Sequence, residues 1–167
     1  MHVVVMGVSG SGKTRVGRLL ADELARPFVE ADDLHPAANV AAMSAGVPLT
    51  DELRAPWLVA VRDAMSAHHQ AGLDAVVACS ALRRGYRDVL RGAAGGARFV
   101  HVVVAPDELE RRLTHRAGHF MPPSLLASQL ATLEDLAPDE DGVAVASGPT
   151  PAETARAALA ALTGLGE

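Results

Sequence analysis

A glycine-rich stretch near the start of the chain has the residue types and the spacing needed to bind phosphate. Residues 7–14 read Gly-Val-Ser-Gly-Ser-Gly-Lys-Thr and match the pattern G-x-x-x-x-G-K-[ST]. The glycines let the backbone curl tightly, so that its N–H groups can surround an anion. Lys13 offers a point charge to the outer phosphates of a nucleotide, and the hydroxyl of Thr14 can ligate Mg²⁺. The residues predicted to hold the nucleotide are Gly7, Ser9, Gly10, Ser11, Gly12, Lys13 and Thr14.

The segments on either side of this stretch suit the same interpretation. An apolar run at residues 3–6 predicts a buried strand, and apolar side chains recur with helical spacing after Thr14. Strand, loop and helix would place the anion at a helix N-terminus, where the dipole stabilises negative charge. The alternative is a glycine-rich turn with a chance lysine. Lys13 is the only lysine in the chain, which favours a specific role for it.

A pair of acidic residues follows the second apolar run. Residues 27–31 predict a short strand that delivers Asp32 and Asp33 at its C-terminal end. Ligands of open α/β sheets bind at that edge. Pro36 disfavours helix at the residue before it, so we expect the acidic pair on a loop. One of the two carboxylates can accept the proton of an attacking hydroxyl; the alternative is a merely solvated loop.

Several arginines are candidates for holding an anionic substrate. Arg54 lies between an acidic turn and the apolar Trp57, which suits a clamp for a carboxylate. A second group follows the third expected strand, and Arg83 is its best ligand candidate because it lies closest to the strand end. The alternative for the group, which comprises Arg83, Arg84 and Arg87, is an ordinary exposed helix face.

Two further arginines predict a lid over the phosphates. Arg112 and Arg116 are four residues apart and therefore share one helical face. A break at residues 118–123 follows them, so the region 112–128 is expected to close and present cations to the transferring phosphate. No N-K-x-D run for guanine recognition is present. The combination of P-loop, carboxylate and arginine-rich lid is typical of a small-molecule kinase that uses ATP and Mg²⁺.

Composition and charge narrow the class of protein. A chain of 167 residues with 49% apolar and 21% charged residues predicts one soluble domain. No apolar run approaches the roughly 20 residues of a membrane span. The net charge of −5 argues against a nucleic-acid surface, so local arginines must attract an anionic substrate. A single cysteine, Cys79, and the lack of a signal-peptide pattern favour the cytoplasm.

The order of the expected elements predicts an α/β fold. Strands are expected at residues 3–6, 27–31, 73–79, 99–104 and 143–146, with helical patterns between them. This alternation predicts a P-loop NTPase fold, with a five-stranded parallel sheet and helices on both faces. Residues 36–72 would form a helical substrate-binding region, in which two prolines predict an ordered loop at residues 48–57 before a helix. Ser80 is expected to cap the next helix, and the later helices are expected at 106–116, 124–136 and 153–162.

In these motifs the chain resembles the gluconate kinases (gluconokinases), which belong to the same broad group as shikimate kinase and the nucleoside monophosphate kinases. Besides the P-loop, the matching runs are D-D-L-H-P at 32–36, P-L-T-D at 48–51, R-A-P-W-L at 54–58, C-S-A-L at 79–82, Y-R-D-V-L-R at 86–91 and H-F-M at 119–121, with Ser128-Gln129 and Leu133-Glu134 after them. Many families share the P-loop, but the other runs in this order are much more specific. The resemblance implies ATP-dependent phosphorylation of D-gluconate at its 6-hydroxyl, which gives 6-phospho-D-gluconate.

The resemblance also implies roles for individual residues. The strand-end pattern of the family directs the carboxylate of Asp32 toward the substrate, so Asp32 is the expected base. The expected catalytic residues are Lys13, Asp32, Arg112 and Arg116, and the expected substrate-binding residues are Asp32, His35, Arg54, Arg83 and His119. A purely structural role remains the alternative for His35. The family further suggests a homodimer.

Two positions depart from the family pattern. Leu53 stands where an aspartate usually precedes the arginine of the R-A-P-W-L run, so the substrate preference could differ. Glu30 stands where an aspartate is commoner, which changes reach but not charge; Glu30 or Asp32 could assist Thr14 at the magnesium ion. The alternatives are therefore a kinase for another small polyol acid, such as shikimate, and a non-catalytic nucleotide-binding regulator.

Overall fold

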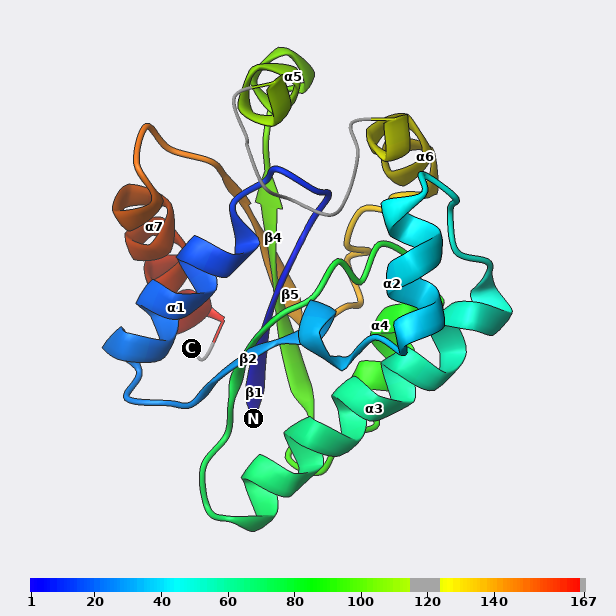
Figure 1. Ribbon diagram of the computed structural model, residues 1–167. Coiled ribbons are helices and arrows are strands. Elements are labelled where there is room, and N and C mark those ends of the chain that lie inside the picture. Colours follow the sequence, from blue (N-terminus) through cyan, green and yellow to red (C-terminus); the bar gives the residue numbers. More distant parts are fainter. Residues whose placement is uncertain (115–123, 166–167) are drawn as a thin grey trace.

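A five-stranded parallel sheet forms the centre of the molecule (Figure 1). The computed structural model describes residues 1–114 and 124–165. The strands are β1 (His2–Met6), β2 (Phe28–Glu30), β3 (Val76–Ala78), β4 (Ala97–Val103) and β5 (Gly142–Ala146), and their order across the sheet is β2-β3-β1-β4-β5. All four neighbouring pairs are parallel, which confirms the predicted fold class.

The central position of β1 explains the apolar run at residues 3–6. Val4 pairs with Val77 of β3 on one side and with Phe99 of β4 on the other. Every residue of β1 is buried. A strand enclosed by two neighbours and covered on both faces requires apolar side chains at successive positions. The P-loop therefore starts from the central strand of the sheet.

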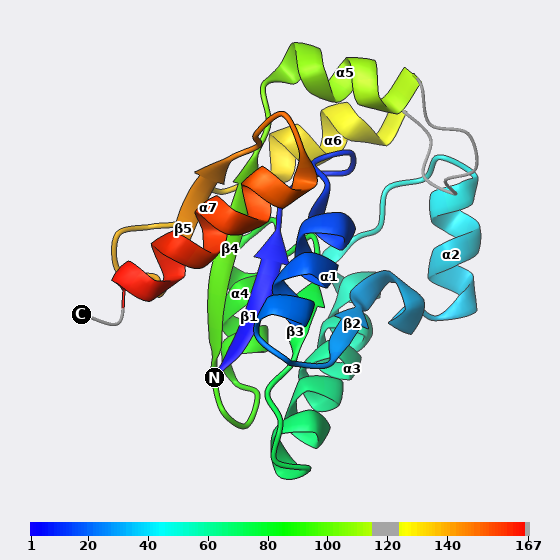
Figure 2. The same cartoon turned by 90° about the vertical axis from the view of Figure 1, so that its left-hand side faces the viewer.

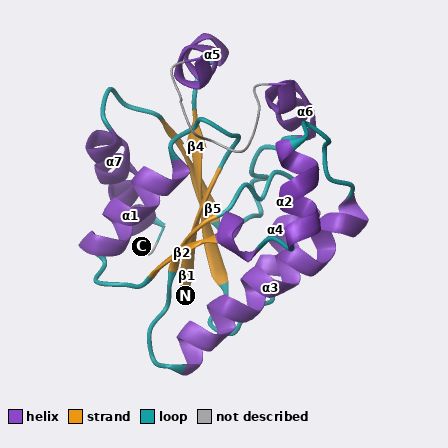
Figure 3. Cartoon of the chain, viewed as in Figure 1, coloured by secondary structure: helices purple, strands orange, loops and turns teal. Residues whose placement is uncertain are grey.

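Helices cover both faces of the sheet, as the alternation of elements predicted (Figure 3). On one face α1 (Lys13–Glu23) packs with α7 (Pro151–Gly164). On the other, α3 (Asp51–Gln70) packs with α4 (Arg84–Arg91). Val16 and Leu20 of α1 belong to the first apolar layer, and Trp57, Val61 and Met65 of α3 belong to the second. The face of α3 that carries these three residues is therefore the buried one.

Three shorter helices surround the end of the sheet at which the strands terminate (Figures 1 and 2). They are α2 (Ala37–Ser44), α5 (Pro106–Thr114) and α6 (Ser124–Thr132). The predicted helix at 124–136 thus ends four residues early. The backbone N–H of Glu134 instead donates to the carbonyl of Leu82, 2.7 Å away, which ties the chain after α6 to the start of α4.

The long helix α3 begins earlier than the two prolines suggested. Residues 51–57 were expected to be a loop, but α3 starts at Asp51 and contains Pro56. Thr50 caps the helix, because its hydroxyl accepts the N–H of Leu53, and acidic residues fill the first turn. The cap and the acidic first turn stabilise the helix by more than it loses through the one intrahelical hydrogen bond that Pro56 cannot donate. The earlier start brings Asp51 and Arg54 onto one rigid element.

Two further local expectations were wrong. Asp32 and Asp33 lie on a turn of 3₁₀ helix, η1 (Ala31–Leu34), rather than on an irregular loop; η1 ends before His35, as the following proline requires. Ser80 does not cap α4. The capping position is Arg83, and the carboxylate of Glu134 accepts the N–H of Arg84 at 2.7 Å, so a distant residue satisfies this helix end.

Among the described residues, none of the helices combines the length and apolar character that a bilayer span requires.

Candidate active site

The P-loop has the backbone that its glycines permit. The φ angles of Gly7, Gly10 and Gly12 are 140°, 83° and 96°, all in the left-handed region. A Cβ on Gly7 would also lie 2.9 Å from the carbonyl oxygen of Val102, so close packing excludes a side chain there. Helix α1 begins at Lys13, directly after this turn, and its N-terminal N–H groups are directed at the loop.

The interior of the loop contains polar groups suited to an anion. The Lys13 ammonium donates to the carbonyl of Val8 at 3.0 Å, and the backbone N–H of Ser11 donates to the same carbonyl at 3.2 Å. Among the described residues, Ser11 Oγ is the buried side-chain oxygen that lacks a hydrogen-bond partner. Buried hydroxyls are rarely left unsatisfied, so this oxygen suits a site that a phosphate completes.

A threonine and a glutamate form the part of the site that suits a magnesium ion. The Thr14 hydroxyl donates to Glu30 Oε2 at 2.8 Å. Because its proton is engaged, the lone pairs of the Thr14 oxygen are available to a cation. Burial raises the pKa of the Glu30 carboxyl, although the hydrogen bond from Thr14 opposes the shift. The Thr14 hydroxyl and the Glu30 carboxylate both offer oxygen ligands, which Mg²⁺ prefers, so these residues fit a magnesium ion.

One cavity lies beside the P-loop, with a volume of about 350 Å³. It is lined by Gly10, Ser11, Gly12, Arg15, Val16, Glu108, Arg112, Ser147, Gly148, Pro149, Pro151 and Thr154. Arg112 of α5 extends into this wall: its guanidinium donates to Glu108 at 2.8 Å and to the Ser147 hydroxyl at 3.0 Å. The Glu108 carboxylate and the Ser147 hydroxyl therefore hold the Arg112 guanidinium beside the P-loop, where it can contact the phosphates of a nucleotide.

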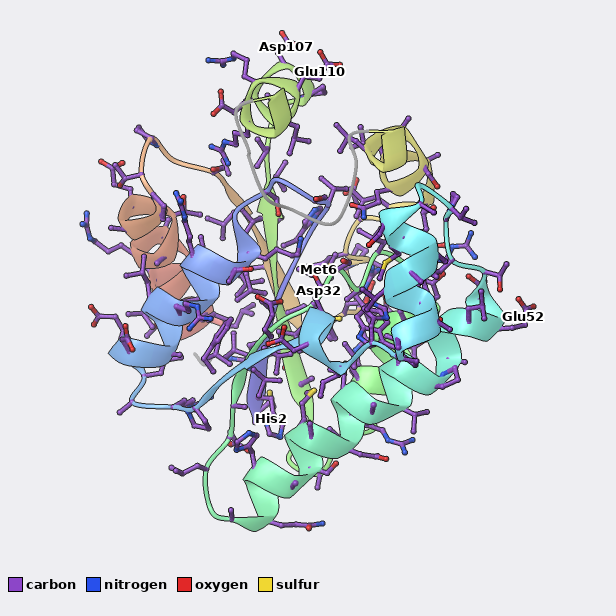
Figure 4. All side chains as sticks on the ribbon, in the orientation of Figure 1. His2, Met6, Asp32, Glu52, Asp107 and Glu110 are labelled. Atoms are coloured by element: carbon purple, nitrogen blue, oxygen red, sulfur yellow. The ribbon has the colours of Figure 1, made fainter. Side chains whose placement is uncertain are left out.

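A second cavity is formed by η1, the start of α3, the loop before α4, and α6. It is lined by Asp32, His35, Met43, Pro48, Leu49, Arg54, Trp57, Ser80, Ala81, Leu82, Tyr86, Ser128 and Gln129. Asp32 lies near the centre of the molecule in Figure 4, whereas Asp107 and Glu110 lie on the outer side of α5. Asp33 is exposed, as expected for a solvated neighbour. The wall therefore brings together three of the predicted substrate residues: Asp32, His35 and Arg54.

His35 is held against the floor of this cavity. Its ring stacks on Trp57 with centroids 4.1 Å apart and an interplanar angle of 12°, and the Trp57 indole donates to the Ala31 carbonyl at 2.7 Å. Burial lowers the pKa of the His35 imidazole, which favours its neutral form. The side-chain nitrogen of Asn39 lies 3.5 Å from His35 Nδ1. A neutral ring that accepts at Nδ1 carries its proton on Nε2, so it can donate one hydrogen bond.

Arg54 belongs to a polar network that the sequence did not fully reveal. Its guanidinium donates to the Tyr86 hydroxyl at 3.2 Å and lies 3.6 Å from Asp51. Tyr86 in turn donates to Asp51, which also accepts from Arg83 at 2.7 Å. The hydrogen bond from Tyr86 lowers the pKa of the Asp51 carboxyl. Asp51 and Tyr86 lie in two of the family-like runs, and that is the signal that could have indicated them.

The other arginines of α4 differ in position. Arg83 is absent from the cavity wall and pairs with the exposed Asp51 instead. Arg84 pairs with Asp139 at the surface. Arg87 is fully buried and bonds Glu140, so an exposed helix face is the wrong description of this residue. Two other predicted residues, Arg116 and His119, lie outside the described residues, as does most of the proposed lid.

Comparisons with known proteins give the family. Residues 3–136 match the family model described as "AAA domain". The chain is 53% identical over 143 residues to the gluconokinase of Gluconobacter oxydans, a match that covers 86% of this chain and 80% of that protein. It is 41% identical over 140 residues to the thermosensitive gluconokinase of Escherichia coli, covering 84% and 75% of the two chains.

Solved structures agree with this relationship. The crystal structure of a gluconokinase from Sinorhizobium meliloti has a TM-score of 0.87 and 48% identity, covering 98% of this chain and 92% of that one. A shikimate kinase from Aquifex aeolicus, 16% identical with a TM-score of 0.60, covers 98% of this chain and 97% of its own and shares the fold alone. On the sequence identity and the coverage together, the chain belongs to the AAA domain family and to the gluconokinases.

Proposed function

We propose that this protein transfers the γ-phosphoryl group of ATP to the 6-hydroxyl of D-gluconate and releases ADP and 6-phospho-D-gluconate. The single observation that carries this proposal is the presence of Asp32 and Arg54 in the wall of one cavity, which also contains Gln129, a hydrogen-bond partner of the P-loop residue Ser9. A linear sugar acid has a hydroxyl at one end and a carboxylate at the other. It can therefore present the hydroxyl to a base and the carboxylate to a guanidinium at the same time.

Each residue then has a chemical role. Lys13 and Arg112 neutralise the charge of the phosphates, and the P-loop N–H groups orient them. Asp32 accepts the proton of the attacking hydroxyl. A magnesium ion, when bound, would neutralise phosphate charge, and Thr14 with Glu30 would hold it. His35 would donate a hydrogen bond to a sugar hydroxyl, and Arg54 would bind the carboxylate. We also propose that Arg116 and His119 contribute from the lid.

The test is a coupled ADP-release assay with gluconate, glucose and shikimate. We expect turnover with gluconate and not with glucose, because glucose lacks the carboxylate that Arg54 binds. Lys13→Ala should abolish turnover without changing the circular dichroism spectrum, because Lys13 contacts the loop and not the core. Equal rates with glucose would contradict the carboxylate clamp, and a preference for shikimate would replace gluconate as the substrate.

We further propose a cytoplasmic enzyme that acts as a homodimer and has no nucleic-acid or membrane partner. The proposal rests on the family and on the chain's charge of −5. Cys79 is buried, and burial raises the pKa of its thiol to about 12, so it stays protonated and unreactive. Light scattering after size-exclusion chromatography would decide between monomer and dimer.

A further inference from the structure

A hydrogen bond joins the P-loop to the wall of the cavity that contains Asp32 and Arg54. We call this cavity the acceptor cavity, because it would hold the substrate that accepts the phosphoryl group. The side-chain oxygen of Gln129, on α6, accepts the backbone N–H of Ser9 at 2.6 Å. The two residues are 120 positions apart in the sequence. Gln129 also lines the cavity that contains Asp32 and Arg54. One side chain therefore contacts the place proposed for the sugar and the loop proposed for the phosphates.

The peptide group that Gln129 holds is also the one that holds the catalytic lysine. The N–H of Ser9 and the carbonyl of Val8 belong to the same planar peptide unit. That carbonyl accepts the Lys13 ammonium at 3.0 Å. Because the unit is rigid, fixing its N–H also fixes the direction of its carbonyl. The bond from Ser9 to Gln129 also polarises the carbonyl and makes it a better acceptor for Lys13.

The position of Gln129 in the wall of this cavity gives the hydrogen bond a consequence. Gln129 lines the cavity together with Asp32 and Arg54. A sugar acid held between those two residues therefore meets the side chain that holds the peptide unit between Val8 and Ser9.

We infer that Gln129 is a positioning residue that couples occupation of the sugar-acid cavity to the placement of Lys13 at the nucleotide phosphates. The identity of the acceptor in this statement rests on the proposed function. The link from Gln129 through the peptide unit to Lys13 does not depend on it. The coupling would make Lys13 adopt its catalytic position when both substrates are present, which favours phosphoryl transfer to the sugar over transfer to water.

The chain offers a direct probe, because Lys13 is its only lysine. Protein grown with lysine labelled at the ε-carbon and ζ-nitrogen gives one side-chain NMR signal, and that signal reports Lys13. Gln129→Met removes the accepting oxygen with little change in size. Gln129→Glu retains an oxygen that can accept the N–H of Ser9. Gln70→Met is the matched control, because Gln70 is exposed at the end of α3 and is the only other glutamine.

In the free proteins, we expect the Lys13 signal of Gln129→Met to differ from wild type, and that of Gln129→Glu to lie closer to wild type. Addition of gluconate should shift the signal in wild type and Gln70→Met but not in Gln129→Met. The kcat of Gln129→Met should fall by about tenfold to a hundredfold, in line with a misplaced catalytic group. Circular dichroism checks that each variant is folded.

Three results would overturn the inference. The first is a Lys13 signal that is the same in free wild type and free Gln129→Met. The second is a gluconate response in Gln129→Met equal to that of wild type. The third is a wild type that phosphorylates gluconate without any response at Lys13. If wild type fails to phosphorylate gluconate at all, the proposed function is wrong, and the comparison of the free proteins still decides the link to Lys13.

Discussion

Two arginine clusters include residues of α4, one through Tyr86 and one through Arg87, and they differ in burial and in the partners that surround them. Arg87 and its partner Glu140 are buried, with side chains 0% and 1% exposed. The Arg87 guanidinium bonds both carboxylate oxygens of Glu140 at 2.7 Å. Its remaining donors meet backbone carbonyls, those of Ala81, Leu82, Glu134 and Asp135. Such a cluster has no donor left for a ligand.

The second cluster surrounds Arg54 at the edge of the acceptor cavity. Its partners are the Tyr86 hydroxyl and Asp51, a carboxylate that is 53% exposed. Exposed ion pairs are weak, so a substrate carboxylate can replace Asp51 beside Arg54 at low cost. The two arginines differ in burial and in the number of occupied donors, so we predict a structural role for Arg87 and a ligand-binding role for Arg54.

Removal of Arg87 should have the largest effect. Arg87→Ala removes the bidentate partner of the buried Glu140 and leaves it with the ion pair to Arg91. Breaking a buried pair costs about 3–5 kcal/mol of unfolding free energy, and Arg91 compensates part of that loss. Urea denaturation measures the change. Arg62→Ala is the control, since Arg62 pairs with its exposed neighbour Asp63. If Arg87→Ala lost no more unfolding free energy than the control, Arg87 would not be the structural residue that this comparison makes it.

The pH dependence of stability should report the same buried pair. The hydrogen bond from Arg87 is the main cause that lowers the pKa of Glu140 from 4.5 to about 2. A lowered carboxyl pKa stabilises the fold above the unfolded value and loses that contribution as pH falls from about 5 toward 2. The shift corresponds to roughly 3 kcal/mol. Unfolding experiments from pH 7 to pH 3 should give a shallower pH dependence for Glu140→Gln than for wild type.

The Arg54 cluster should affect catalysis rather than stability. Arg54→Ala should lower kcat/KM for gluconate by about 1.5–3 kcal/mol, the range for hydrogen bonds to charged groups. Arg54→Lys retains the charge but not the planar fork, so it should recover only part of the loss. Steady-state kinetics and urea denaturation test both variants. A stability loss that matched the kinetic loss would make Arg54 a structural residue.

A smaller effect is expected at Tyr86. Tyr86→Phe removes the hydroxyl that links Arg54 to Asp51 and leaves the buried ring in place. Loss of one such hydrogen bond should raise KM for gluconate by roughly two- to tenfold, with kcat nearly unchanged. A fall in kcat at constant KM would instead assign the hydroxyl to the transition state.

The smallest effect should follow the loss of Arg83, the predicted substrate ligand that the structure places outside the cavity wall. Its partner Asp51 is exposed, and exposed pairs contribute little. Arg83→Ala should change kcat/KM for gluconate by at most about fivefold. A loss as large as that of Arg54→Ala would restore Arg83 as a substrate ligand.

The local features of the site were predictable because they depend on residues close together in the sequence. The glycines of residues 7–14 fix the conformation of the P-loop, and the apolar run before them fixes the strand from which it starts. The start of α3 was mistaken because two prolines were given more weight than the cap at Thr50.

Contacts between distant segments were not predictable in the same way. The sequence marked Gln129 as part of a family-like run but gave it no role, because its partner is 120 residues away. Arg83, Arg84 and Arg87 looked alike as one helical arginine group, yet the structure gives them an exposed pair, a surface pair and a buried pair. The spacing along a helix does not reveal which side another segment will cover.

The sequence by itself determined the phosphate loop, the parallel sheet and the family, because glycine conformations, apolar periodicity and motif order are properties of short stretches. The tertiary structure alone decided which arginine is buried, which carboxylate supports Thr14 and which side chain holds Ser9. The physical reason is that hydrogen-bond partners and desolvation depend on segments that meet only when the helices pack on the sheet.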